Sequence, residues 1–90
     1  MYGYLTFYFK VKINNENHYA KYTSDFAKPI TEEFAEMVKK LIYEAFSPKG
    51  KIEEIKFCSE EEYVKNTIDM NNTSIKWDED KIWVEETNNN

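Results

Sequence analysis

Hydrophobic and polar residues alternate without interruption from position 4 to position 13, and this alternation predicts a β-strand with one buried face. The apolar face consists of Leu5, Phe7, Phe9, Val11 and Ile13. The other face consists of Tyr4, Thr6, Tyr8, Lys10 and Lys12. Positions 14–17 predict a turn, since Asn tolerates the left-handed backbone that hairpins need. Positions 18–23 are then expected to return as the second strand of a β-hairpin.

The segment after the hairpin has the periodicity of an α-helix. Thr31 is a suitable N-cap, and Glu32 and Glu33 stand in the first turn, where the helix dipole favours negative charge. Residues 47–50 predict the end of the helix, because they include Pro and Gly. The segment is therefore expected to be an amphipathic helix packed on the sheet. Its predicted apolar stripe is Phe34, Val38, Leu41 and Ala45, flanked by Met37, Ile42 and Phe46.

The second half of the chain predicts shorter elements. Residues 52–58 indicate a third strand with Ile55 and Phe57 facing inward. Ser59 followed by Glu62 forms a capping box and predicts a short helix. Beyond it we expect a loop over 69–73, strands at 74–77 and 82–86, and a connection at 78–81.

The order β-β-α-β-α-β-β predicts an α+β fold, a two-layer sandwich of a mainly antiparallel sheet with the amphipathic helix on one face. A length of 90 residues fits a single domain, which we place at 1–86, with a polar tail at 87–90 that is expected to fray. The composition, 41% hydrophobic and 17% aromatic, is typical of a globular protein. No apolar run approaches the length of a membrane span, and no basic leader follows Met1, so we expect a cytoplasmic protein.

The charged residues of the chain limit the kinds of partner that we expect it to bind. The chain has 17 acidic and 12 basic residues, and every basic residue is Lys. Without Arg it lacks the planar fork that recognises guanine and phosphate, so we do not expect direct nucleic-acid binding. The acids are concentrated in residues 52–90, which hold eleven acidic residues and four Lys. This imbalance favours a partner with a basic surface, although an acidic run is also typical of an ordinary solvated face.

We therefore predict a non-enzymatic module that binds another protein by presenting an acidic surface to a basic, nucleic-acid-binding groove. In size and acidity the chain is similar in type to the small inhibitors that phages and mobile elements use against host defence enzymes. That similarity rests on no particular residues. The predicted contact residues are Glu60, Glu61, Glu62, Trp77, Asp78, Glu79, Asp80 and Trp83, with one of the Trp rings as the anchor.

A Tyr-rich hairpin face gives the alternative. Aromatic rings on an exposed strand favour self-association, so the second hypothesis is a structural protein that forms a homodimer through this face. Stacking of single-stranded bases is a weaker interpretation, because only Lys10, Lys12 and Lys21 are then at hand for phosphates. The alternative interface consists of Tyr4, Tyr8, Tyr19 and Tyr22.

Catalytic and metal chemistry have little support in the sequence. Cys58 and His18 are the single Cys and the single His, and no third residue is identified that would orient them as a nucleophile and base. One Cys and one His are also too few for structural zinc. We expect no enzyme activity, no metal and no cofactor.

Overall fold

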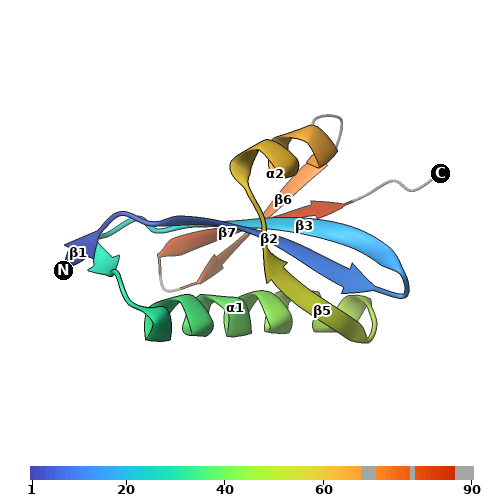
Figure 1. The fold of residues 1–90 in the computed structure, drawn as a ribbon, viewed down its shortest axis with the longest axis horizontal. Coiled ribbons are helices and arrows are strands. Elements are labelled where there is room, and N and C mark those ends of the chain that lie inside the picture. The colour runs from blue at the N-terminus through green and yellow to red at the C-terminus, as the bar shows by residue number, and fades with distance from the viewer. Residues whose placement is uncertain (68–70, 78, 87–90) are drawn as a thin grey trace.

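The computed structural model describes residues 1–67, 71–77 and 79–86, and it confirms an α+β fold. A five-stranded antiparallel sheet has the order β5-β2-β3-β7-β6. Two helices lie on opposite faces of this sheet, α1 along one face and α2 on the other (Figure 1). The main elements are β2 (Thr6–Ile13), β3 (Glu16–Thr23), α1 (Glu32–Phe46), β5 (Ile52–Phe57), α2 (Glu60–Thr67), β6 (Asn71–Trp77) and β7 (Asp80–Glu86).

The predicted hairpin is formed by β2 and β3, which pair from Thr6 opposite Thr23 to Ile13 opposite Glu16. Its turn is tighter than predicted. Asn14 and Asn15 have φ values of 52° and 65°, so two residues in the left-handed region make the turn, as the right-handed strand twist prefers. Glu16 and Asn17, predicted as turn, therefore begin β3.

The core lies between the sheet and α1. Helix α1 begins after Thr31, whose Oγ1 accepts a hydrogen bond from Phe34 N at 3.1 Å. Its buried stripe runs at a spacing of four residues rather than through Leu41 and Ala45, which are only partly buried. The buried apolar residues of sheet and helix are Phe9, Val11, Ile13, Ala20, Tyr22, Phe34, Val38, Ile42, Phe46, Ile82 and Val84.

Helix α2 follows β5 directly and is capped as predicted, because Glu62 N donates to Ser59 Oγ at 3.0 Å. A 3-10 turn, η1 (Ser47–Lys49), ends α1 and leads into β5. In β5, Ile55 packs against the core, whereas Phe57 stays 47% exposed at the strand end. The Phe57 ring still contacts Phe9, with ring centroids 4.8 Å apart.

The last two strands are longer than predicted. Residues 71–73, predicted as loop, belong to β6, and Asp80 and Lys81, predicted as connection, belong to β7. Strand pairing continues to Trp77 opposite Asp80, with Glu79 at a φ of 70° in the turn. The predictions for residues 69, 70 and 78 and for the tail at 87–90 lie outside the described residues.

A second, two-stranded sheet was not predicted. It pairs β1 (Tyr2–Gly3) with β4 (Lys28–Pro29) at the end of the molecule that holds the N-terminus (Figure 1). Strands of two residues carry no period by which a sequence pattern reveals them. Within the described residues, none of the helices is long and apolar enough to cross a membrane.

Candidate functional site

The end of the molecule around β1 and β4 exposes Met1 and four further large side chains, and these four define what we call the N-terminal end surface. They are Tyr2, Tyr4, Phe26 and Ile30, with exposed fractions of 70%, 76%, 53% and 51%. The small sheet places the segments of Tyr2 and Ile30 side by side, since Tyr2 pairs with Pro29 and Ile30 N donates to the Met1 carbonyl at 3.1 Å. A Cβ at Gly3 would lie 3.1 Å from Ile30 Cδ1, so the glycine lets the Ile30 side chain lie close to β1.

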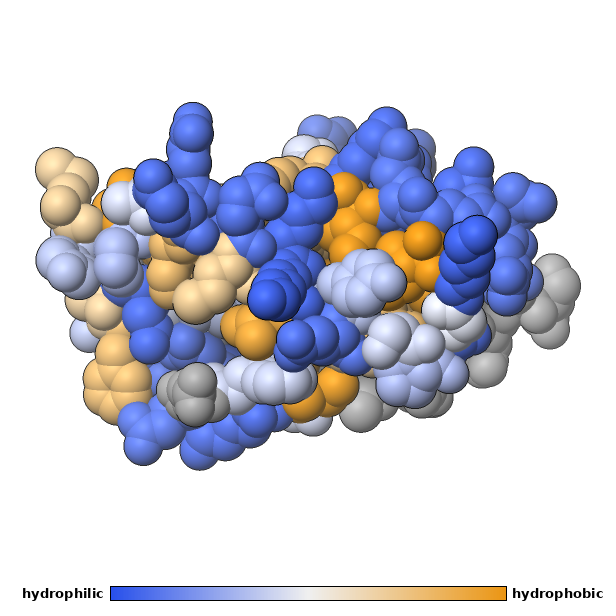
Figure 2. All heavy atoms as spheres, turned by 90° about the horizontal axis from the view of Figure 1, so that it is seen from below, coloured by the Kyte–Doolittle hydropathy of each residue, from blue (hydrophilic) through white to orange (hydrophobic). Residues whose placement is uncertain are grey.

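A groove adjoins this surface. Its volume is about 320 Å³, and it lies between the start of β2 and the first turn of α1. Seen from the α1 side, moderately hydrophobic side chains, coloured tan, reach the surface at this end, and a more strongly hydrophobic patch lies nearer the middle of the molecule (Figure 2). The groove is mainly apolar and is lined by Leu5, Phe7, Ile30, Thr31, Glu32 and Ala35.

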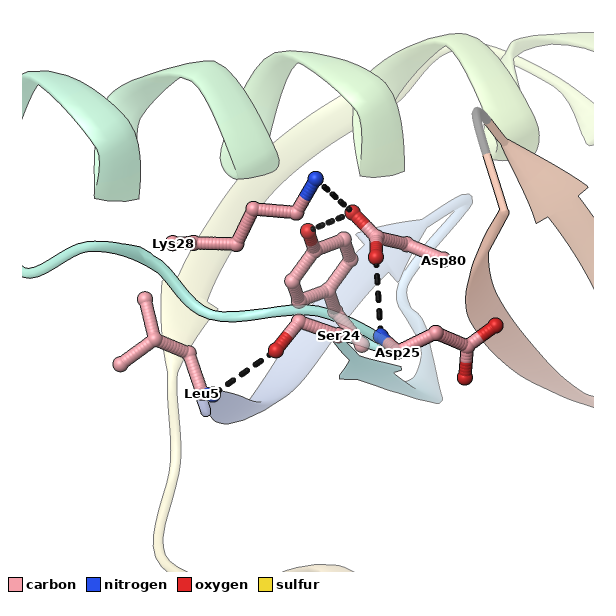
Figure 3. Close-up of polar contacts among 6 residues, drawn as sticks. Leu5, Ser24, Asp25, Lys28 and Asp80 are labelled. Atoms are coloured by element: carbon pink, nitrogen blue, oxygen red, sulfur yellow. Dashed lines mark hydrogen bonds and ion pairs between the residues drawn. The ribbon is translucent and has the colours of Figure 1, made fainter. Parts of the chain in front are cut away.

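Beside this end lies a buried polar cluster centred on Asp80, which is only 5% exposed (Figure 3). Its carboxylate accepts hydrogen bonds from Tyr22 Oη at 2.5 Å and from Asp25 N at 2.9 Å, and Lys28 Nζ lies 3.3 Å away. Burial, followed by the hydrogen bond to Asp80, raises the pKa of Tyr22. The Asp80 carboxylate points inward and joins β7 to β3 and β4, so Asp80 does not belong to an exposed surface, and its contact with a partner stays a prediction.

The α2 acids and Asp80 do not form one anionic surface, because they lie on opposite faces of the sheet. Glu60 and Glu61 are exposed in the first turn of α2, on the sheet face opposite α1 (Figure 1). The Asp80 carboxylate instead faces the α1 side, beneath the helix (Figure 3). Glu79 is exposed in the β6–β7 turn, and Asp78 lies outside the described residues.

The two Trp residues point to opposite faces of the sheet. Trp77 packs against the core from the α1 side, and its Nε1 is buried without a hydrogen-bond partner in the described part of the chain. Trp83 lies on the α2 side and is partly exposed, with Lys21 Nζ 5.5 Å from its ring centroid. Both Trp residues are therefore partly buried, rather than one in the core and one partly exposed as expected. Trp83, which does not pack against the core, is the better placed of the two as an anchor.

The Tyr face predicted as an alternative interface is not one exposed surface. Tyr22 is fully buried on the α1 side. It lies two positions after the buried Ala20 on β3, so both side chains point to the same face of the sheet. Tyr19 is 5% exposed, and the Tyr63 ring of α2 packs 5.1 Å from the Tyr8 ring. Of the four predicted residues, Tyr4 alone is mainly exposed, and it belongs to the N-terminal end surface.

Cys58 and His18 lie on different sides of the sheet. His18 lies on the α1 side, with its ring 6.0 Å from that of Phe46, and burial lowers its pKa. Cys58 lies beside Glu62 of α2, where burial and then the Glu62 charge raise the pKa of the thiol to about 11. An activated thiol needs a lowered pKa. The residues that the structure describes also hold no group of three or more His, Cys, Asp or Glu placed to bind a metal ion.

No protein-family model matches this chain, and neither a curated protein nor a solved structure matches it at a significant level. The N-terminal end surface was missed by the sequence analysis. Its one sequence signal is a set of large apolar residues outside the periodic segments, namely Tyr2, Phe26 and Ile30.

Proposed function

We propose that this protein is a non-enzymatic module that binds another protein through the N-terminal end surface. The observation that carries the proposal is that Tyr2, Tyr4, Phe26 and Ile30, each more than half exposed, lie on neighbouring segments at one end of the molecule, beside an apolar groove. Exposed apolar patches with a polar rim are typical of interaction sites, and Tyr is enriched at such interfaces. The groove offers the kind of pocket in which a partner's anchor residue is desolvated.

The acidic first turn of α2 favours a second candidate, recognition of a basic groove by an inhibitor of the anti-defence type. Glu60 and Glu61 are exposed, and the described residues contain no ion pair to either. Exposed charge of one sign speeds encounter with a surface of opposite sign and orients the two proteins. With Asp80 buried, this surface rests on α2 alone.

The test is affinity capture from the source cell or its host with matched variants of the full chain. In the Tyr4→Ser/Ile30→Ser variant we expect the affinity for the captured partner to fall by more than about 30-fold, since two anchor side chains are lost. The control is Tyr43→Ser, which removes a ring that is 52% exposed on the outer side of α1, and it should bind like the wild type. Equal thermal unfolding midpoints show that both variants are folded.

Three outcomes would contradict the first candidate. Retention of the partner by Tyr4→Ser/Ile30→Ser excludes the N-terminal end surface. Release by moderate salt, together with loss in Glu60→Lys/Glu61→Lys/Glu62→Lys, supports the acidic candidate instead. A salt-resistant dimer in the molar mass of the free protein, without any partner, supports self-association.

A further inference from the structure

The α2 side of the large sheet is rich in lysine, despite the acidic composition of the chain. Strand register places at least one Lys from each of the five strands on this side. This concentration of lysines is not visible in the sequence, because β6 and β7 lie far from β2 and β3 along the chain. These residues are Lys10, Lys12, Lys21, Lys56, Lys76 and Lys81.

Three of these lysines surround Trp83, and together the four residues define what we call the lysine–tryptophan face. Lys21 lies opposite Trp83 on the neighbouring strand β3, and Ser74 lies opposite it on β6. Lys81 precedes Trp83 by two positions, so both side chains point to the same side of β7. Lys76 is paired with Lys81 across β6 and β7.

This face is accessible, and the ion pairs among the described residues do not involve its lysines. Lys76 and Lys81 are exposed, and Lys21 and Trp83 are partly exposed. The α2 acids adjoin this face without belonging to it: the Glu62 charge helps to raise the pKa of Tyr19, which lies two positions before Lys21 on the same side of β3.

We propose that the lysine–tryptophan face binds single-stranded nucleic acid, with a base stacked on Trp83 and backbone phosphates held by Lys21, Lys76 and Lys81. Charge complementarity favours a polyanion, and the partly exposed Trp83 indole favours a polyanion that also carries flat rings. Sheet faces that bind single strands combine these two features, and they need no bidentate readout of base edges. The absence of Arg thus removes sequence specificity rather than this mode of binding.

The net charge of −5 opposes binding of any polyanion at long range. We therefore expect a modest affinity that is measurable at low salt. If the three lysines contact three phosphates, a plot of the logarithm of the binding constant against the logarithm of the salt concentration should have a slope of about −2. The proposal is independent of the protein-binding function, because the lysine–tryptophan face and the N-terminal end surface consist of different residues.

The test is fluorescence anisotropy of labelled ten-nucleotide oligo-dT and oligo-rU with the full chain between 20 and 200 mM salt. Removal of the stacking ring in Trp83→Ala is expected to weaken binding by about 5- to 150-fold. Lys76→Gln/Lys81→Gln should reduce the salt slope to about −0.7, since one phosphate contact remains. The matched control is Lys39→Gln/Lys40→Gln on α1, which removes the same charge from the other side and should leave both quantities unchanged.

A difference between oligo-dT and oligo-rU identifies which type of strand is preferred, and either preference supports the proposal. Circular dichroism of Trp83→Ala verifies its fold, and the lysine variants test the face even if that variant is unfolded. Four results would overturn the proposal: no binding at 20 mM salt, equal weakening in the α1 control, equal affinity for a DNA duplex, or equal affinity for poly-glutamate. The last two would show attraction to any polyanion without base stacking.

Discussion

The Asp80 carboxylate joins segments that are far apart in the sequence. It accepts hydrogen bonds from the Tyr22 hydroxyl of β3 and from the backbone N–H of Asp25, and it forms an ion pair with the Lys28 ammonium group of β4. A buried carboxylate is stabilising only where charged or polar partners replace its lost water. These three partners do so, and they hold the small β1–β4 sheet against the end of the large sheet.

Replacement of Asp80 by Ala is expected to lower the free energy of unfolding by about 3 kcal/mol, because Tyr22 and Lys28 are then left without their acceptor. Tyr22→Phe, which removes one donor, should cost about 1 kcal/mol. Urea unfolding followed by circular dichroism measures both changes. The control is Glu53→Gln, an exposed acid on β5, with an expected change below about 0.5 kcal/mol. An unchanged urea midpoint for Asp80→Ala would show that the cluster adds nothing to stability.

The Cys58 thiol is expected to react slowly with iodoacetamide. Its pKa of about 11 reduces the thiolate fraction at pH 8 relative to an unperturbed Cys. The greater nucleophilicity of a more basic thiolate offsets part of this, so the net rate should be about tenfold lower than that of a Cys peptide. Glu62→Gln removes the charge that helps to raise the pKa, and it should speed the reaction. A rate above that of the peptide would indicate an activated thiol and reopen an enzymatic interpretation.

The raised pKa of Cys58 also determines how the free energy of unfolding changes with pH. Because this pKa is higher in the folded state than in the unfolded state, the folded protein loses the thiol proton at a higher pH than the unfolded chain does. The contribution of Cys58 to stability is therefore complete below pH 9 and is lost as the pH rises from 9 towards 11. Tyr22 acts in the same direction from about pH 10 upward, because its pKa is also raised.

At the scale of the element, the β2–β3 turn shows how local chemistry sets register. Asn14 and Asn15 both adopt positive φ, which most residues avoid because of contact between Cβ and the backbone. Asn accepts this conformation at lower cost than other non-glycine residues do. The two-residue turn then forces the pairing in which Phe9, Val11 and Ile13 face the core together.

Asn15→Ala is expected to destabilise the protein by about 1 kcal/mol, whereas Asn15→Gly should be neutral or slightly stabilising. Urea unfolding tests both variants against Asn17→Ala, which changes the same residue type two positions later, inside β3. If Asn15→Ala unfolds at the wild-type urea concentration, the positive φ at this position is not a source of strain.

Elements with a clear period were predictable from the sequence, because the period is a local property. The alternation in β2, the four-residue spacing in α1 and the Ser59–Glu62 cap of α2 each lie within one short segment. The β1–β4 pairing and the strand character of residues 71–73 and 80–81 depend instead on partners elsewhere in the chain. Local patterns contain no information about those partners.

At the scale of the whole molecule, the charge imbalance between the two halves of the chain does not become two oppositely charged faces. The acidic second half supplies Lys76 and Lys81 to a lysine-rich side of the sheet and buries Asp80 on the other side. Sheet order β5-β2-β3-β7-β6 produces this mixing, since it inserts the last strands beside β3. Function assigned from the charge of a segment alone is therefore unreliable here, and surfaces are the better guide.

The sequence by itself determined the α+β class, the hairpin, both helices and most of the core, because hydrophobic periodicity and capping residues act over a few positions. Only the tertiary structure decided which side chains share a surface. It moved Asp80 and Tyr22 into a buried cluster, covered Tyr8 and Tyr19 with α2, and gathered Tyr2, Tyr4, Phe26 and Ile30 at one end. The physical reason is that strand pairing and helix packing join residues across dozens of positions, where no local pattern reaches.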